Sequence, residues 1–143
     1  MISKSELEEF FAAVDGDFPV RLSERVNIGE WCEKLLSNGT VCAEAIDGEL
    51  AAVVAGYANN HEEKTGYIAV AAVKRNFRRR GLGAAAVSKF IKKAGDAGME
   101  TVYLYVHKSN GAAIRMYKGI GFKEVESDRT DSLRLSVRCG DIL

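Results

Sequence analysis

Seven consecutive residues near the middle of the chain combine positive charge with bare backbone: Arg78-Arg79-Arg80-Gly81-Leu82-Gly83-Ala84. We expect this run to lie where a strand turns into a helix, whose first turn leaves N–H groups unpaired and positively polarised. The glycines and Ala84 leave those groups open to a phosphate, and the arginines attract it. The run therefore predicts a diphosphate site; a glycine turn with solvated arginines is the alternative.

Two familiar phosphate loops do not fit this run. The P-loop pattern GxxxxGK[ST] is absent from the chain. Gly81 to Ala86 satisfies a loose G-x-G-x-x-A dinucleotide pattern, but the next strand ends at Val106-His107-Lys108, with no acidic residue to hold a ribose. Repeated βαβ units are also missing, so we do not expect a dinucleotide-binding fold.

The elements that must position this run form one domain of mixed α/β type. Apolar spacing and capping residues predict helices from Ser3 or Ser5 to Gly16, from Asn27 to Asn38-Gly39, from Gly81 to Ala97 and from Asn110 to Lys118. Apolar runs predict strands at 41–46, 49–57, 67–73, 101–107, 122–125 and 133–137. Asp47-Gly48 predicts a tight hairpin, and the strand–helix–strand order over 67–107 predicts a right-handed parallel crossover in a mostly antiparallel sheet.

Composition restricts the class of protein. The 143 residues are 47% hydrophobic and 28% charged, which suits a single folded domain, residues 1–143, and not a disordered chain. Apolar runs fall far short of the ~20 residues of a membrane span, so we expect no membrane partner. The cysteines, at 32, 42 and 139, are scattered, which is typical of reduced thiols in a cytoplasmic protein.

The charge is balanced overall and uneven along the chain. Residues 1–63 hold 4 Lys and Arg against 13 Asp and Glu, a net charge of −9, whereas residues 64–143 hold 16 against 7, a net charge of +9. The acidic half favours a cationic ligand, and the basic half favours a polyanion such as a phosphorylated cofactor. A solvated surface explains the same asymmetry.

Two segments together resemble the GCN5-related N-acetyltransferase (GNAT) family. Residues 78–83 match its cofactor-binding signature, Arg/Gln-x-x-Gly-x-Gly/Ala, and Asn110, Ala113, Tyr117 and Gly121-Phe122 match a second family pattern at the usual distance. The resemblance covers nearly the whole chain. It implies the GNAT-like acyl-CoA N-acyltransferase fold, with a mixed central sheet of about six to seven strands flanked by about four helices.

The resemblance also implies acetyl-CoA as co-substrate. In this family the strand before the signature splays from the strand after the helix, and the pantetheine arm lies in that gap. The diphosphate would rest on the amides from Arg79 to Ala84, and Tyr117 matches the family's usual general acid. By position, the cofactor-binding residues are Ala71, Ala72, Val73, Arg78, Arg79, Arg80, Gly81, Leu82, Gly83, Ala84, Asn110 and Ala113.

Direct acetyl transfer to a primary amine agrees with these residue types. A thiolate leaves from a thiol of pKa about 8.5, and a nearby phenol of pKa about 10 can protonate it. Strand N–H groups can polarise the thioester carbonyl. Tyr117 has the alternative of a core tyrosine, and Asn110 that of a helix N-cap. No residues have metal-ligand spacing, so we expect no metal.

The base and the acceptor are less defined. The candidate bases, besides a relayed water, are Glu44, His61, Glu62, Glu63 and His107, each of which is equally a surface residue. Tyr57, Asn59, Asn60 and residues 18–26 are candidates for the acceptor pocket. A small-molecule amine, an amino sugar, a peptide terminus and a protein lysine all remain open.

Two other functions use the same residues. A CoA-binding regulatory domain would keep the diphosphate site without catalysis. A nucleic-acid-binding module would use the basic cluster, but the cluster is local, the net charge is zero and no aromatic platform accompanies the arginines. A homodimer is plausible because the final hairpin leaves a sheet edge.

Overall fold

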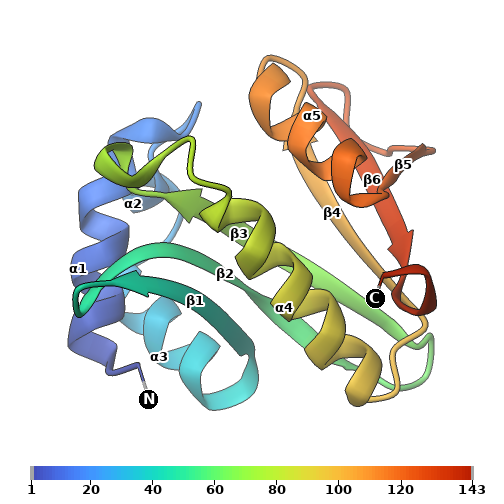
Figure 1. Cartoon of the computed structure of the whole chain (residues 1–143), viewed down its shortest axis with the longest axis horizontal. Helices are drawn as coiled ribbons and strands as arrows, with labels where there is room; N and C mark the ends of the chain where they lie inside the picture. Colours follow the sequence, from blue (N-terminus) through green and yellow to red (C-terminus); the bar gives the residue numbers. More distant parts are fainter. Residues whose placement is uncertain (1, 143) are drawn as a thin grey trace.

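The computed structural model describes residues 2–142 and has a six-stranded sheet with helices on both faces (Figure 1). The strands are β1 (Thr40–Ile46), β2 (Glu49–Asn60), β3 (Thr65–Val73), β4 (Thr101–His107), β5 (Lys123–Val125) and β6 (Ser132–Arg138). The α-helices of these residues are α1 (Lys4–Val14), α2 (Leu22–Arg25), α3 (Ile28–Asn38), α4 (Leu82–Asp96) and α5 (Gly111–Ile120). The predicted mixed α/β fold is confirmed.

The sheet order is β1-β2-β3-β4-β6-β5, and the β3–β4 pair is parallel whereas the other pairs are antiparallel. α4 connects the two parallel strands, as the strand–helix–strand order predicts. β2 and β3 run further than expected, because Asn60 still pairs with Thr65 although its type is typical of a turn.

The first and third helices begin at the predicted capping residues. The Ser3 hydroxyl accepts from the Glu6 amide at 3.1 Å, and the Glu6 carboxylate accepts from the Ser3 amide at 3.1 Å. The Asn27 side chain accepts from the Glu30 amide at 3.0 Å. These bonds use N–H groups that a helix leaves unpaired at its start.

Helix α2 was not predicted. Its four residues are too few to show a helical period, and the sequence indicates only a connection there. A contact distant in sequence holds it, because the Asp15 carboxylate accepts from the amide and the hydroxyl of Ser23, each at 2.7 Å.

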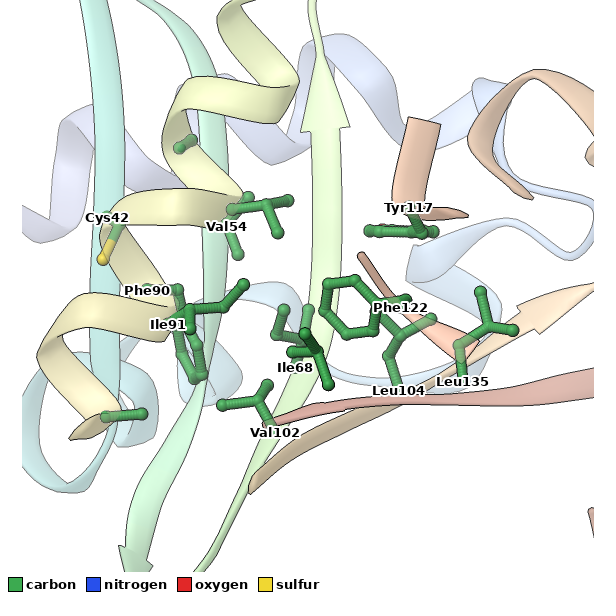
Figure 2. Packing of buried hydrophobic residues seen from close by; sticks show 14 of the residues in the cluster. Cys42, Val54, Ile68, Phe90, Ile91, Val102, Leu104, Tyr117, Phe122 and Leu135 are labelled. Atoms are coloured by element: carbon green, nitrogen blue, oxygen red, sulfur yellow. The ribbon is translucent and has the colours of Figure 1, made fainter. Parts of the chain in front are cut away.

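Each face of the sheet has its own core. Phe10 and Phe11 of α1 and Leu35 of α3 pack on β2 and β3 on one face. On the other face, Phe90 and Ile91 of α4 and residues of α5 pack on β2, β3, β4 and β6. Phe90 and Ile91 lie to the left of β3 and Tyr117 of α5 lies to its right in Figure 2. No helix among the described residues is long and apolar enough to cross a membrane.

The parallel strands part midway along their length. β3 and β4 pair from Thr65–Thr101 to Ile68–Leu104 and no further, although β3 continues to Val73 beside β2 and β4 continues to His107 beside β6. The sheet is therefore open between the carboxyl ends of its two parallel strands.

Candidate active site

A cleft of about 620 Å³ occupies the opening between β3 and β4. Residues 68–71 of β3 and residues 104–107 of β4 form its two sheet walls. Asn110, Ala113 and Tyr117 line it from α5 and the turn before that helix. The connection from Phe18 to Val26 lines the mouth on the other face of the sheet, together with Trp31 and Lys34 of α3.

The main chain of β3 faces the opening at alternate residues. The Lys74 amide donates to the Ala51 carbonyl at 2.9 Å, so the amides of Ala72 and Val70, which alternate with it, also point toward β2. The amides of Ala71 and Val73 therefore point into the gap. Of the three predicted main-chain contacts, Ala71 and Val73 fit this geometry, and Ala72 does not, because its amide belongs to the ladder with β2.

The glycine turn leaves the start of α4 uncapped. Gly81 precedes the helix with φ 75° and no side chain bonds to the first-turn amides. Arg79 also has a positive φ, 67°, a conformation that costs a non-glycine residue about 1–2 kcal/mol. Backbone in which successive N–H groups turn inward forms an anion-binding concavity. A short 3-10 helix, Arg75–Phe77, separates the turn from β3, and the residues of the turn lie outside the lining of the cleft.

Gly83 allows α4 to pack closely on its neighbours. A Cβ atom at this position would lie 3.2 Å from Met116 Sδ of α5 and 3.2 Å from Val73 Cγ2 of β3. Leu82 and Ala84, on either side, are half-buried. The small residue therefore keeps the open end of α4 close to both β3 and α5.

The arginines of the turn have different partners. Arg78 donates to the Asp17 carboxylate at 2.8 Å and to the Val73 carbonyl at 3.1 Å. Its side chain thus ties the turn to the segment that follows α1, and its role in binding the cofactor stays a prediction. Arg80 lies over the Phe77 ring, with Cζ 5.5 Å from the centroid.

Tyr117 is buried and reaches the cleft. Its exposed fraction is 6%, its ring packs edge-on against Phe122 at 5.4 Å, and it belongs to the cleft lining. Burial raises the pKa of its hydroxyl well above that of a free phenol, because the phenolate would be poorly solvated. The hydroxyl therefore stays protonated at neutral pH and can donate a proton or a hydrogen bond.

Asn110 caps helix α5, which is the structural role that the sequence analysis gave as an alternative to ligand binding. Its Oδ1 accepts from the Ala113 amide at 3.3 Å and so caps α5. The cap uses only the oxygen of the side-chain amide, and Asn110 also lines the cleft. Capping and contact with a ligand are therefore compatible.

Most candidate bases lie away from the cleft. Glu44 forms an ion pair with Lys89 at 2.7 Å. His61, Glu62 and Glu63 are exposed at the turn between β2 and β3, which adjoins the closed end of the β3–β4 pair. None of these four residues lines the cleft, so the structure does not bring these candidate bases to it.

His107 lines the cleft, but its ring is already held as an acceptor. The Ser109 amide donates to Nδ1 at 3.1 Å, and the Ser109 hydroxyl lies 2.6 Å from the same atom. An Nδ1 that accepts from an amide carries no proton, so the neutral ring carries its proton on Nε2. This arrangement makes His107 a hydrogen-bond donor toward other groups and disfavours it as the base.

The mouth opposite α4 is lined by aromatic and cationic side chains. Tyr57 and residues 18–20 line it as predicted, but Asn59 and Asn60 do not. Asn59 donates to the Asn38 carbonyl at 3.3 Å, and Asn60 accepts from the Glu63 amide at 3.1 Å. Leu22, Arg25 and Val26, from the same predicted range 18–26, line it as well, whereas sequence reasoning missed the lining residues Trp31, Lys34, Tyr67, Tyr105 and Arg129.

The tyrosines of this mouth continue across the open sheet face. Tyr67 and Tyr103 pack at 5.0 Å, and Tyr105 follows at 6.3 Å. The alternation of Tyr103 and Tyr105 with buried Val102, Leu104 and Val106 was visible in the sequence. The position of α1 and α3 over β1 to β3 only, which leaves this part of the sheet uncovered, was not. Among the described residues, no group of three or more His, Cys, Asp and Glu could hold a metal ion.

A model of the acetyltransferase (GNAT) family matches residues 4–122, so the chain belongs to that family. An N-alpha-acetyltransferase of Sulfurisphaera tokodaii is 41% identical over 64 residues, which cover 44% of this chain and 38% of that protein. A [ribosomal protein bS18]-alanine N-acetyltransferase of Salmonella typhimurium is 42% identical over 53 residues, or 37% and 36% of the two chains. A chloroplastic GCN5-related N-acetyltransferase 6 of Arabidopsis thaliana is 38% identical over 68 residues, 48% of this chain. The matches span only 24% to 38% of these relatives' lengths.

Solved structures share the fold over nearly the whole chain. Ard1 from Thermoplasma volcanium superposes with a TM-score of 0.78 at 20% identity, covering 96% of this chain and 93% of that one. NAA60 of Arabidopsis thaliana in complex with a bisubstrate analogue gives 0.77 at 22% identity, covering 96% and 94%. At these identities the similarity establishes the fold.

Proposed function

We propose that the chain transfers the acetyl group of acetyl-CoA directly to a primary amine. The observation that carries this proposal is the parting of β3 and β4 beside the uncapped start of α4. An extended pantetheine arm needs strand N–H and C=O groups that are not paired with another strand, and its diphosphate needs free N–H groups. The opening between β3 and β4 offers the first, and the nearby start of α4 offers the second. Membership of the acetyltransferase (GNAT) family supports the same activity.

The residues present fit coenzyme A. The Ala71 and Val73 amides point into the gap, where a pantetheine amide carbonyl can accept from them. The amides from Arg79 to Ala84 would hold the diphosphate, since no side chain caps them. Ala113 leaves room for the arm, and the Asn110 amide nitrogen would donate to it. Arg79 and Arg80 would add long-range attraction.

Two groups of the chain act in the transfer. A β3 amide donates to the thioester carbonyl as the amine nitrogen bonds to its carbon. The Tyr117 hydroxyl gives its proton to the sulfur as the carbon–sulfur bond breaks, and it is reprotonated from solvent. The amine reacts in its neutral form and releases its second proton to water; Asp131, the one carboxylate among the described residues that line the cleft, accepts from the Ser132 hydroxyl.

The acceptor would enter from the mouth opposite α4, between the Phe18–Val26 connection and the loop before β6. A small-molecule amine and a peptide amino group both fit an opening of this size. We keep the cytoplasm as the compartment because Cys32, Cys42 and Cys139 are all unpaired. Pairing of two copies through β5, an edge strand, stays a prediction.

Thermal unfolding with acetyl-CoA tests binding, and release of free thiol with a panel of amines tests turnover. A ligand at ~100 times its Kd adds about 2.7 kcal/mol to the free energy of unfolding. We expect this stabilisation with acetyl-CoA and none with NAD or ATP at the same concentration. Stabilisation without turnover would favour the regulatory domain, and no stabilisation would refute the proposal.

A further inference from the structure

The charge at the acceptor mouth differs from the charge of the segments that form it. Residues 1–63 are strongly acidic, yet their charged residues that line the cleft are Arg25 and Lys34. Arg129 joins them from the loop before β6, and Asp131 is the one carboxylate among the lining residues that the structure describes. The acidic side chains of the first half lie elsewhere, so the expectation of a cationic acceptor has no support in the cleft.

Among residues 2–142, none of these three cations forms an ion pair with a carboxylate. The ion pairs formed among residues 2–142 use Lys4, Lys74, Arg75, Arg78, Lys89, Lys92 and Arg138. Asp131, the carboxylate nearest in the lining, accepts from the Ser132 hydroxyl at 3.1 Å. The positive charge of the mouth is thus available to a ligand.

A further cation, Arg134, lies beside Tyr105 but outside the lining of the cleft. Arg129 and Arg134 both approach the ring of Tyr105, with Cζ 3.7 Å and 6.0 Å from its centroid. The Asp128 carboxylate accepts from the Tyr105 hydroxyl at 2.6 Å, and this bond, together with the nearby Arg129 and Arg134, lowers the pKa of Asp128. The Nε atom of Arg134 is buried and has no acceptor among the described residues. The Arg134 guanidinium lies over the Tyr103 ring, with Cζ 4.4 Å from its centroid.

From these observations we infer that the acceptor is an amine that carries an anionic group close to its amino group. This inference rests on the proposed acetyl transfer and narrows its substrate class. Arg129 contacts the anionic group, Lys34 and Arg25 attract it, and the Tyr67 and Tyr105 rings flank the carbon chain between the two groups. An acidic peptide terminus and a free acidic amino acid share this chemistry.

The test compares acceptors that differ only in charge. Three hexapeptides have a free N-terminal alanine followed by two glutamates, two glutamines or two lysines. A second arm compares free glutamate with its diamide, in which both carboxyl groups are blocked. We expect kcat/KM for the glutamate peptide to exceed that of the glutamine peptide about tenfold, the size of one charge-assisted hydrogen bond, and that of the lysine peptide by more.

Substitutions test whether residues at the mouth cause the preference for glutamate-containing acceptors. Arg129→Gln should reduce the preference for glutamate to near unity without changing the KM for acetyl-CoA, and Arg129→Glu should reverse it. Arg138→Gln removes an exposed arginine of the same strand region outside the cleft, and it should leave the preference unchanged. Preference in the peptide arm alone would indicate a peptide acceptor, and preference in the amino-acid arm alone a small molecule.

Three results would overturn the inference. Equal turnover of the three peptides together with equal turnover of glutamate and its diamide would exclude charge selection, and so would preference for lysine. A preference that survives Arg129→Glu would place the selecting group elsewhere. Absence of transfer to every acceptor, by contrast, would refute the proposed acetyl transfer itself, and the inference would fall with it.

Discussion

The two sides of the cleft offer different kinds of chemical group to a ligand. On the side of α4 and α5, the groups offered to a ligand are main-chain amides and small side chains, and they come from one stretch of sequence and its neighbour. On the opposite side, they are aromatic and cationic side chains from four separated segments. The first side depends on backbone conformation, whereas the second can change its selectivity through single side chains without refolding.

Tyr117 stands where the two sides meet, and its substitution should give the largest effect. In Tyr117→Phe the ring still fills its place against Phe122, so we expect stability and acetyl-CoA affinity to stay nearly unchanged. Loss of the proton donor should lower kcat by about 100-fold or more. Single-turnover kinetics measure this step, and equal rates in the two proteins would remove Tyr117 from the role of general acid.

A charge at the start of α4 should separate stability from binding. Ala84→Glu places a carboxylate in the first turn, where the helix dipole stabilises it by about 0.3–1 kcal/mol in the free protein. The same carboxylate would repel a diphosphate, so we expect CoA affinity to fall about tenfold or more. Ala84→Gln, of equal size, controls for the added bulk and should bind CoA about tenfold more tightly than Ala84→Glu; calorimetric titration giving the same Kd for both variants would contradict a diphosphate at this turn.

The pH dependence of unfolding should report the burial of Tyr117. Because burial raises its pKa above the ~10 of a free phenol, the folded chain keeps this proton at a pH where the unfolded chain loses it. Its contribution is complete below about pH 10 and then declines by about 1.4 kcal/mol per pH unit.

The comparison with Tyr117→Phe isolates that contribution. Burial also raises the pKa of the Cys32 thiol to about 11, so the wild-type curve contains more than one group. Urea unfolding of both proteins at several pH values between about 9 and 11 gives the difference. A difference that does not change with pH in this range would mean that the hydroxyl is solvated in the folded chain.

The smallest expected effect is a difference in CoA affinity between two glycine substitutions that should cost the same stability. Gly81 and Gly98 both have positive φ, 75° and 95°, and a Cβ atom would meet nothing within 4 Å at either position. Gly81→Ala and Gly98→Ala should therefore each cost about 1 kcal/mol of stability. CoA affinity should fall only for Gly81→Ala, and an equal affinity in both variants would show that the turn's conformation is not needed for binding.

Local signals were sufficient for most of the fold. Ser3 and Asn27 cap their helices, and Asp47 and Gly48 adopt the positive φ values, 51° and 81°, that a two-residue hairpin turn needs. The strand–helix–strand order over residues 67–107 predicted the parallel pair. Helix α2 escaped prediction because the Asp15–Ser23 contact that supports it has no periodic signature.

The site was predictable on one side only. The turn at Gly81 and the cap at Asn110 are local, so their residue types indicate them. The direction of the Ala72 amide depends on its register with β2, and the engagement of Arg78 depends on Asp17, 61 residues away. The meeting of Lys34, Tyr105 and Arg129 depends on the whole sheet. These relations arise from tertiary packing, which the spacing of residues along the chain does not reveal.

The most direct test of the central claim is a crystal structure of the protein with coenzyme A. The claim predicts the diphosphate within hydrogen-bond distance of the amides between Arg79 and Ala84, with the pantetheine arm in the gap between β3 and β4. A diphosphate bound at any other place, with those amides facing solvent, would contradict it.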